Sequence, residues 1–399
     1  MNRLMSHGQA MRSTRAFSRV THFMASSSGP RRWTATGPGA AVTPHVGRRR
    51  TPEKVTVDTW HVKRYTARTM PGALILTRRD VARLLPPETC LAAVERALLA
   101  HAGGRTLPPA ILGVHAGGGG FHVKAAGADL GRRYFAAKVN GNFSSNPGRN
   151  GLPAIQGVVV LADADTGAPL AVMDSIEITA LRTAATTALA ARHLARAGAA
   201  VATIVGCGVQ GRHHARALAR ALPLERLWLL DAAPGRARAL AVEMAAELGL
   251  HVEAASSLRA ALADSAVCVT CTPARAPFLG PDALPPGILV AAVGADSEDK
   301  QELEAEVLAS AAVVVDHLEQ CATIGELHHA LARGLVTRAD VRAELWEVVA
   351  GTRAGRVADD EIVVFDSTGT ALQDVAAAAA VYERAIEGGS GVAVDLGGR

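Results

Sequence analysis

The order of apolar and polar residues divides the chain near residue 70. Residues 1–69 are rich in Arg, Ser, Thr and Gly and have no sustained hydrophobic period, which predicts a disordered tail. From Met70 onward the pattern becomes regular. It predicts, in chain order, a strand and a helix within 73–85, a helix within 86–104, a strand at 133–139, a hairpin within 157–174 and a helix at about 179–196.

After residue 200, apolar strands alternate with helical stretches. Near-continuous apolar strands joined by ~10–15-residue helical segments are typical of a parallel sheet covered on both faces. The expected strands lie at 201–206, 226–231, 251–255, 267–272, 288–294 and 313–316. A helix is expected at 297–310, and beyond residue 317 the pattern is mainly helical apart from the strand EIVVFD.

Composition limits the classes of protein to consider. A chain of 399 residues with 49% hydrophobic residues fits two domains plus a tail. It contains no run of about 20 apolar residues, so we expect no membrane-spanning helix. The five cysteines lie mostly in apolar runs, which indicates a reducing compartment rather than a disulfide framework, and we expect a cytoplasmic protein.

The net charge of +5 comes from the tail. Residues 1–70 hold 13 Lys and Arg against two acids, whereas residues 71–399 have a balance of −6. The basic charge therefore gives no reason to expect a nucleic-acid partner. The Arg- and Ser-rich, acid-free start also has the composition of an organelle transit peptide, and an over-extended start before Met70 is the other interpretation.

The strongest motif is a GxGxxG run at 206–211, between an apolar strand and a helix. Its glycines permit the tight turn, the approach of a pyrophosphate and close packing of helix on strand. Asp231, at the end of the next strand, would accept hydrogen bonds from the adenosine ribose and repel a 2′-phosphate, which favours NAD over NADP. Nearby Arg236 and Arg238 weaken that preference. We assign cofactor binding to Gly206, Gly208, Val209, Gln210, Gly211, Asp231 and Thr272.

This context predicts an α/β fold. Residues 197–316 are expected to form a Rossmann-type doubly wound parallel sheet. A second, α+β domain is expected from residues 70–196 and 317–390, followed by a short tail at 391–399.

Polar residues outside the motif stand where local structure gives no reason for them. Lys138 interrupts the apolar strand YFAAKVN, so its ammonium must reach solvent or meet an anion. Arg182 and Thr183 fall in or near the first turn of the long helix, where the helix dipole disfavours positive charge. Asp296 directly follows an apolar strand, at the edge where open parallel sheets bind ligands. The alternatives are a surface arginine and an N-cap, a role that Ser297 fills equally well.

No metal site is expected. Cys268 and Cys271 lie three apart in a predicted strand and point to opposite faces, so we interpret both as core residues. Adjacent side chains on a helix diverge by about 100°, which argues against a shared metal for the neighbouring histidines. These are His213 with His214 and His328 with His329.

Six segments together resemble the ornithine cyclodeaminase/mu-crystallin family, from about residue 70 to residue 385. They are AAKVNGN (136–142), GLPAIQGVVVLADADTGAPLAVMD (151–174), ITALRTAATTALAARHLA (178–195), IVGCGVQG (204–211), AVGADSEDKQEL (292–303) and FDSTGTALQD (365–374). The resemblance implies an NAD-dependent enzyme of amino-acid metabolism. It also implies that the second domain binds the substrate and forms a homodimer.

The resemblance further implies roles for single residues. Lys138 and Arg182 match basic residues that hold the substrate carboxylate, Lys138 also being a catalytic candidate. Arg182 and Thr183 also belong to the cofactor site, and Ser367 lies in a segment that contacts the nicotinamide side. Asp296 matches the proposed catalytic acid of ornithine cyclodeaminase, which mu-crystallin-like ketimine reductases lack.

The chain departs from the family in its first lobe. Residues 107–127 lack the usual Met-Pro pair and have no Arg in register. Lys124, or Arg105 upstream, is expected to replace that contact with the substrate carboxylate.

The resemblance favours ornithine cyclodeaminase activity, which converts L-ornithine to L-proline and ammonia through an imine. In that reaction Lys138 and Arg182 would clamp the α-carboxylate, and Asp296 would manage the proton of the side-chain amine. One alternative is an alanine-type amino-acid dehydrogenase or a ketimine reductase using NAD(P). Another is a non-catalytic, mu-crystallin-like dinucleotide-binding protein.

Overall fold

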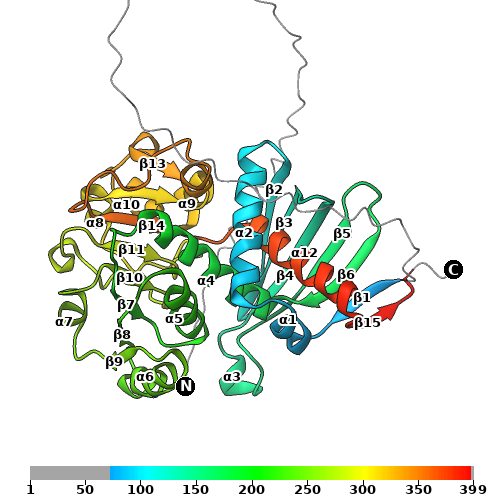
Figure 1. Cartoon of the computed structure of the whole chain (residues 1–399), viewed down its shortest axis with the longest axis horizontal. Coiled ribbons are helices and arrows are strands. Elements are labelled where there is room, and N and C mark those ends of the chain that lie inside the picture. The colour runs from blue at the N-terminus through cyan, green and yellow to red at the C-terminus, as the bar shows by residue number, and fades with distance from the viewer. Residues whose placement is uncertain (1–71, 397–399) are drawn as a thin grey trace, which may run out of the picture. The chain divides into compact units, whose positions relative to one another are not determined.

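The structure is a computed structural model that describes residues 72–396. The tail expected at 1–69 lies outside the described residues. The described part contains two β-sheets, each with its own helices (Figure 1). The predicted fold class is confirmed, with a Rossmann-type parallel sheet beside a second α+β unit.

The first sheet has seven strands in the order β15-β1-β6-β5-β4-β3-β2. Its pairs are antiparallel except for β1 with β6. The strands are β1 (Ala73–Leu76), β2 (Thr106–Ala116), β3 (Gly119–Asp129), β4 (Arg133–Asn142), β5 (Ile155–Asp163), β6 (Pro169–Asp174) and β15 (Val392–Val394). The short helix α3 (Asn146–Arg149) lies between β4 and β5.

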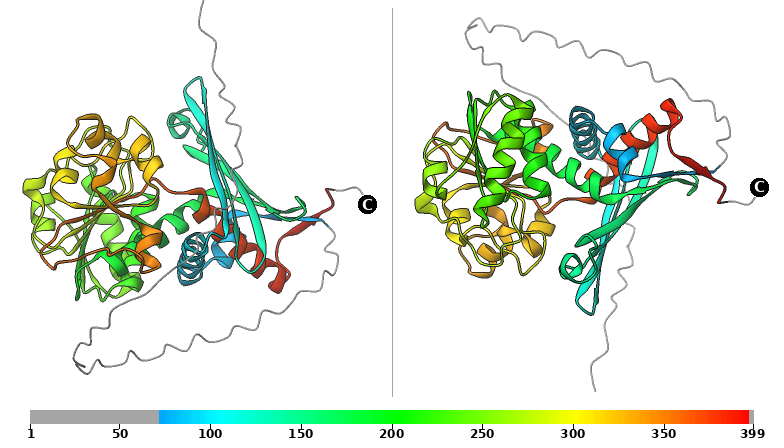
Figure 2. Two further views of the ribbon diagram at one scale, coloured as in Figure 1. Left: turned by 90° about the horizontal axis from the view of Figure 1, so that it is seen from above. Right: turned by 90° about the horizontal axis from the view of Figure 1, so that it is seen from below.

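Helices cover one face of this sheet only (Figure 2). They are α1 (Arg78–Leu84), α2 (Pro87–Ala102) and α12 (Ala371–Gly388). Along β4, Tyr134, Ala136 and Lys138 are buried on the helix side. Phe135 and Val139, which alternate with them, are 38% and 36% exposed on the other face.

The β2–β3 hairpin was not predicted. β2 is exposed along nearly its whole length and contains Pro108 and Pro109, which argue against a strand in the sequence. Its register with β3 shifts between Leu107 and Ala110, around the two prolines. An edge strand tolerates this irregularity because only one of its sides is paired.

The second sheet has eight parallel strands in the order β13-β12-β14-β11-β10-β7-β8-β9. They are β7 (Val201–Val205), β8 (Arg226–Leu230), β9 (His251–Ala254), β10 (Val267–Thr270), β11 (Leu289–Ala292), β12 (Ala312–Val315), β13 (Val341–Glu344) and β14 (Val363–Asp366). The strand order reverses direction between β7 and β10. This reversal is the place where open α/β sheets form a ligand crevice.

Alternate residues of these strands enter two different cores, as a sheet covered on both faces requires. Val267 and Val269 of β10 pack in one core, whereas Cys268 packs in the other. The helices that accompany the sheet are α4 (Ser175–Leu194), α5 (Val209–Ala221), α6 (Pro234–Leu248), α7 (Leu258–Leu262), α8 (Ala305–Ser310), α9 (Leu318–Ile324), α10 (Glu326–Ala332) and α11 (Leu345–Val349).

The structure corrects three expectations in the C-terminal third. Within 317–390, which we had assigned to the second domain, β13 and β14 pair in the eight-stranded sheet and α12 packs on the seven-stranded one. EIVVFD belongs there because a strand buried on both faces is uniformly apolar. Residues 392–394, expected in a tail, form β15 against β1. The other domain boundaries remain proposals.

The third correction concerns the helix expected at 297–310, which is helical only over Ala305–Ser310. The backbone before it bonds elsewhere. The N–H of Gln301 donates to the carbonyl of Ala274, and that of Glu302 donates to the carboxylate of Glu326. These tertiary bonds replace the first turns of the helix.

Candidate active site

β7 ends at Val205, and the chain turns sharply into α5. Gly206 has φ of +108°, a conformation that L side chains rarely adopt. A Cβ at Gly211 would lie 2.0 Å from the Gly206 carbonyl oxygen, so only glycine lets α5 pack this closely. Gly208 is the N-cap of α5 and offers no side-chain hydrogen bond. The N–H groups of the first turn are therefore available to an anion such as a pyrophosphate.

Asp231 follows β8, beside this turn. Its Oδ2 accepts the N–H of Cys207 at 2.8 Å, and its Oδ1 accepts that of Ala233 at 2.8 Å. These bonds fix the carboxylate at the sheet edge, where its other lone pairs can accept ribose hydroxyls. In the first turn of α5, Gln210 has a buried side-chain oxygen without a hydrogen-bond partner among the described residues. The residues of this edge therefore fit a dinucleotide.

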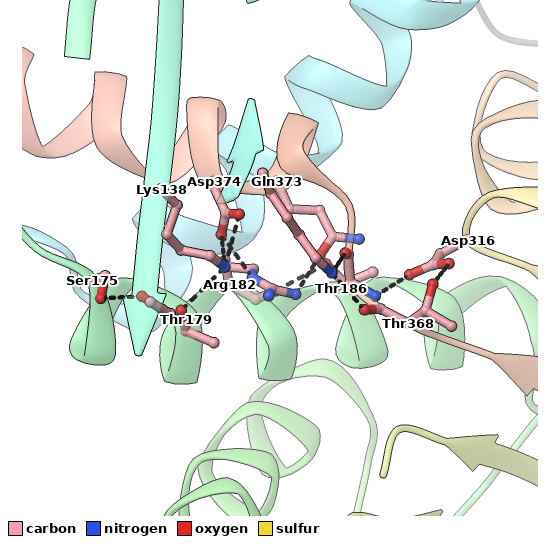
Figure 3. Close-up of polar contacts among 12 residues, drawn as sticks. Lys138, Ser175, Thr179, Arg182, Thr186, Asp316, Thr368, Gln373 and Asp374 are labelled. Carbon is pink, nitrogen blue, oxygen red and sulfur yellow. Dashed lines mark hydrogen bonds and ion pairs between the residues drawn. The ribbon is translucent and has the colours of Figure 1, made fainter. Parts of the chain in front are cut away.

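Buried basic side chains meet at the junction of the two sheets (Figure 3). Lys138 and Arg182 are 4% and 5% exposed, which excludes a surface role for the arginine. Lys138 Nζ lies 2.8 Å from Asp374 Oδ2, and Arg182 Nε donates to Asp374 Oδ1 at 3.0 Å. Arg182 Nη1 also donates to Gln373 Oε1 at 2.8 Å. The anionic partner expected for each cation thus lies in the first turn of α12.

Lys124 adds a third cation to this cluster. It pairs with Lys138 across β3 and β4, so both side chains lie on the same face of the sheet. Its Nζ donates to the carbonyl oxygens of Thr368 at 3.1 Å and Gly369 at 2.7 Å. No salt bridge joins it to a carboxylate among the described residues. We call Lys124, Lys138, Arg182 and Asp374 the cation cluster; fully ionised, it has a net charge of +2.

Burial makes this charge costly. Desolvation, with Arg182 and Lys124 nearby, lowers the pKa of Lys138 to about 7, although Asp374 acts in the opposite direction. Desolvation and Arg182 also lower the pKa of Lys124. Burial alone would raise the pKa of Asp374, but Lys138 and Arg182 outweigh it and keep the carboxylate ionised. A second carboxylate bound here would stabilise the charged form of both lysines.

The loop that joins β14 to α12 passes beside the cation cluster. Asp316 accepts hydrogen bonds from Ser367 Oγ and Thr368 Oγ1, both at 3.1 Å, and from Gly369 N–H at 2.6 Å. Gln320 Nε2 donates to Thr368 Oγ1 at 2.7 Å and to the Gly369 carbonyl at 3.0 Å. The loop is thus held by α9 and the end of β12, and by the bonds from Lys124.

Asp296 lies in the loop after β11, with an exposed side chain that forms an ion pair with Lys300 at 2.5 Å. No helix begins at residue 297, so its N-cap interpretation is wrong. Desolvation by the surrounding protein acts to raise the pKa of Asp296. Nearby Lys300, Lys124 and His122 outweigh this effect, so the pKa lies below its usual value. Lys124 and His122 belong to β3, so charges of the seven-stranded sheet act on this loop of the eight-stranded sheet.

Arg105 is the predicted site residue that the structure does not bring to the cluster. Its Nη1 donates to the carbonyl of Asp129 at 3.1 Å, at the far end of β3. Five residues of strand separate Asp129 from Lys124, or about 16 Å. Of the two replacements considered for the missing arginine, the geometry therefore favours Lys124.

Other predicted cofactor residues have their polar groups engaged within the fold. The N–H and hydroxyl of Thr272 both donate to Glu302, each at 2.7 Å. The hydroxyl of Ser367 donates to Asp316. Thr183 is buried next to Arg182 on α4. Any contact of Thr272 or Ser367 with a cofactor must share or replace these bonds.

Sequence reasoning missed several members of the site. Asp374 and Gln373 lie in FDSTGTALQD, and Lys300 lies in AVGADSEDKQEL, so both segments were quoted without these residues being singled out. Asp374 had no local signal, because the first turn of a helix favours an acid. His122 had no signal, because β3 itself was not predicted.

Within residues 72–396, no group of three His, Cys, Asp or Glu side chains is arranged to hold a metal ion. The five cysteines are free thiols. No helix in this part of the chain is long and apolar enough to cross a bilayer.

The fold and site define an α/β protein that combines a dinucleotide-type turn with a buried cluster of basic side chains. Comparison with known proteins agrees: the model of the ornithine cyclodeaminase/mu-crystallin family matches residues 72–389. The chain belongs to this family, as its sequence motifs predicted.

Solved structures of several activities resemble the chain. An archaeal alanine dehydrogenase, a dimer with bound NAD, superposes with a TM-score of 0.77 and 34% identity over 81% of this chain and 99% of that one. The Δ1-pyrroline-2-carboxylate reductase of Thermococcus litoralis, in complex with NADH and L-proline, gives 0.76 and 31% over 80% and 100%. A lysine cyclodeaminase that recognises L-lysine, L-ornithine and L-2,4-diaminobutyric acid gives 0.70 and 31% over 82% and 96%.

Proposed function

We propose that this protein is an NAD-dependent enzyme that transfers hydride at the α-carbon of an amino acid, or returns it to an α-imino acid. The observation that carries the proposal is the cation cluster. Two buried cations, Lys138 and Arg182, share one carboxylate, and the part-buried Lys124 beside them bonds only to carbonyl oxygens. The cluster lies by the carboxyl edge of a sheet whose glycine-rich turn suits a dinucleotide. An unbalanced buried charge of this sign favours an anionic ligand.

Residues 206–211 and Asp231 would hold the cofactor, through the first-turn N–H groups of α5 and the ribose hydroxyls. A nicotinamide bound there supplies a hydride acceptor or donor. Asp231 supports NAD over NADP, because its carboxylate would repel a 2′-phosphate. The NAD complexes of the two dehydrogenase and reductase neighbours support the same choice.

The substrate carboxylate is assigned to the cation cluster. Asp374 carries one negative charge and pairs with both Lys138 and Arg182, so it neutralises one of their two positive charges. Lys124 bonds only to carbonyl oxygens. A carboxylate that bridges Lys124 and Lys138 would gain charge-assisted hydrogen bonds and fix the α-carbon in position. This assignment moves the main contact from the expected pair Lys138 and Arg182 towards Lys124.

Asp296 is the proposed proton acceptor for the substrate amine. An amine must be neutral to become an imine or to attack one, so it requires a base within reach. Lys300, Lys124 and His122 lower the pKa of Asp296 and so keep it ionised. Because the lowered pKa makes it a weak base, Asp296 would orient the substrate ammonium and relay its proton to solvent, to which its side chain is exposed. The same residue makes ornithine cyclodeamination the second candidate, because the side-chain amine there also has to lose a proton before ring closure.

A substrate panel separates the candidates. L-ornithine, L-lysine, L-alanine and cyclic imines are incubated with NAD(H) and NADP(H), recording absorbance at 340 nm, ammonia and proline. Steady formation or loss of reduced cofactor identifies a dehydrogenase or imine reductase. Proline and ammonia without accumulating NADH identify the cyclodeaminase. Tight NAD binding without turnover of any compound refutes both and leaves a binding protein.

The proposed partner is a second copy of this chain. The uncovered face of the seven-stranded sheet exposes apolar side chains in neighbouring positions of β2 to β5. They are Leu112, Val114, Phe121, Phe135, Val139 and Val158. An apolar sheet face of this kind is typical of an interface, and the alanine dehydrogenase neighbour is a dimer. The free cysteines are consistent with the cytoplasmic location that we propose.

A further inference from the structure

Glu302 is a fully buried carboxylate next to the loops that carry Thr272 and Asp296. The proposed chemistry does not use it. Its exposed fraction is 0%, and no salt bridge joins it to a cation among the described residues. It accepts four hydrogen bonds instead. Thr272 provides its N–H and its hydroxyl, each at 2.7 Å, Thr270 provides its hydroxyl at 2.7 Å, and Gly294 provides its N–H at 2.8 Å.

These four donors lie at the ends of two neighbouring strands. Thr270 ends β10 and Thr272 follows it, while Gly294 follows β11 and leads to Asp296. Glu302 therefore ties together the two loops that leave the sheet at this edge. The fit is close, because a Cβ at Gly294 would lie 2.4 Å from both the carboxyl carbon of Glu302 and the carbonyl oxygen of Thr272.

One further buried acid, Glu326, bonds to the backbone of Glu302, and a third holds the helix that carries Glu326. Glu326, 1% exposed, accepts the N–H groups of Glu302 at 2.7 Å and Leu303 at 3.2 Å. Asp366, at the end of β14, accepts the N–H of Leu327 in the first turn of α10 at 2.9 Å. The three carboxylates thus connect β14, α10 and the loops after β10 and β11 through backbone N–H groups.

The loops that Glu302 joins lie where one half of a bound dinucleotide would be expected. Asp231 and the glycine turn follow β8 and β7, which suit the adenosine ribose and the pyrophosphate. β10 and β11 lie on the other side of β7 in the sheet. A dinucleotide that spans the switch point therefore brings its second nucleoside over the loops that Glu302 ties together.

We propose that Glu302 is a positioning residue that fixes the loops carrying Thr272 and Asp296 against the nicotinamide half of the cofactor. The inference rests on the proposed binding of NAD. A carboxylate without a cation costs free energy to bury, and several charge-assisted bonds to one oxygen pair offset that cost only when the donors are held in one geometry. Burial raises the pKa of Glu302 and its four hydrogen bonds oppose that rise, so the side chain is stable in its ionised form only while the two loops hold these donors in place.

The test compares NAD⁺ with ADP-ribose, which lacks the nicotinamide, by isothermal titration calorimetry of the full chain. Glu302→Gln keeps the side-chain shape but turns an amide N–H₂ towards N–H donors. We expect the Kd for NAD⁺ to rise about tenfold or more, while that for ADP-ribose changes less than about twofold. Glu304→Gln, two residues away and exposed, is the matched control and should change neither value.

A milder pair keeps the proposal testable if Glu302→Gln does not fold. Thr270→Val removes one hydroxyl bond to Glu302, and Thr270→Ser retains it. The valine variant should weaken NAD⁺ about threefold without affecting ADP-ribose, and the serine variant should match the wild type. The positioning role is overturned if the variants lose affinity equally for NAD⁺ and ADP-ribose. It is also overturned if neither Glu302→Gln nor Thr270→Val loses affinity for NAD⁺. A wild-type chain that binds neither ligand instead refutes the proposed function itself.

Discussion

At the scale of single residues, the central feature is one carboxylate shared by two buried cations. Removing Lys138 and Arg182 from water is costly unless an anion compensates them, and Asp374 does so from the first turn of α12. The helix dipole favours an acid at that position. Lys124 has no salt bridge to a carboxylate among the described residues, so the cation cluster keeps a positive charge that a substrate carboxylate can neutralise.

Removing Asp374 should change the pH dependence of the enzyme. Asp374 raises the pKa of Lys138, which burial holds at about 7, so Asp374→Asn should lower it further. Lys138 is charged below its pKa, and substrate affinity should fall as the pH rises through it. In the variant that fall should begin at lower pH, with kcat/KM reduced about tenfold or more at pH 7.

The measurement is kcat/KM and kcat between pH 5.5 and 9 with the best substrate of the panel. Asp165→Asn, which removes an exposed carboxylate paired with Arg133, serves as the control and should keep the wild-type profile. If the pH profile of kcat/KM is the same in Asp374→Asn as in the wild type, Asp374 is not the group that sets the charge of Lys138.

Some of these residues could be predicted and others could not. Lys138 was found because a charge in an apolar strand violates local preferences. Arg182 was singled out for a reason that the structure contradicts: α4 begins at Ser175, not near residue 179, so Arg182 lies about two turns into the helix and not in its first turn. Asp374 satisfies the same preferences, so nothing local marks it. Its partners lie 192 and 236 residues away in the sequence, and only the fold brings them together.

At the scale of elements, seven of the eight strands of the parallel sheet were predicted, because most of them are apolar runs buried on both faces. The edge strand β13 was missed because VRAE alternates apolar and charged residues over only four positions. The β2–β3 hairpin was missed because its prolines and glycines obscure the alternation of a strand. The helix expected at 297–310 was too long because tertiary bonds to Ala274 and Glu326 take its first N–H groups. Such competition between local and tertiary bonds is not visible in one sequence.

The uncovered sheet face gives a prediction at this scale. Phe135→Glu with Val139→Glu places two carboxylates in the middle of the proposed interface. Because an unpaired buried charge costs of order 2–3 kcal/mol, the dimer should weaken about 100-fold or more. Light scattering after size exclusion should then give the monomer mass at micromolar concentration. Val242→Glu, on the exposed side of α6, should leave the dimer intact. A wild-type chain that is monomeric contradicts this assignment.

At the scale of the whole described chain, the site depends on both sheets. The eight-stranded sheet supplies the glycine turn, Asp231 and the loop of Asp296, and the seven-stranded sheet supplies Lys124 and Lys138. Arg182 and Asp374 come from α4 and α12, the helices that connect the two units. Neither sheet alone holds both the dinucleotide-type turn and the cation cluster, so the proposed function requires residues from both sheets.

The most direct test of this account is the fate of the hydrogen on the α-carbon. Amino acids of the panel, deuterated at C2, are incubated with NAD⁺, and the cofactor and products are analysed by mass spectrometry. The account predicts deuterium in the reduced cofactor, or at C2 of a cyclised product after its return. Deuterium that is released to water, or that stays on unreacted amino acid throughout the panel while NAD⁺ is bound, would contradict it.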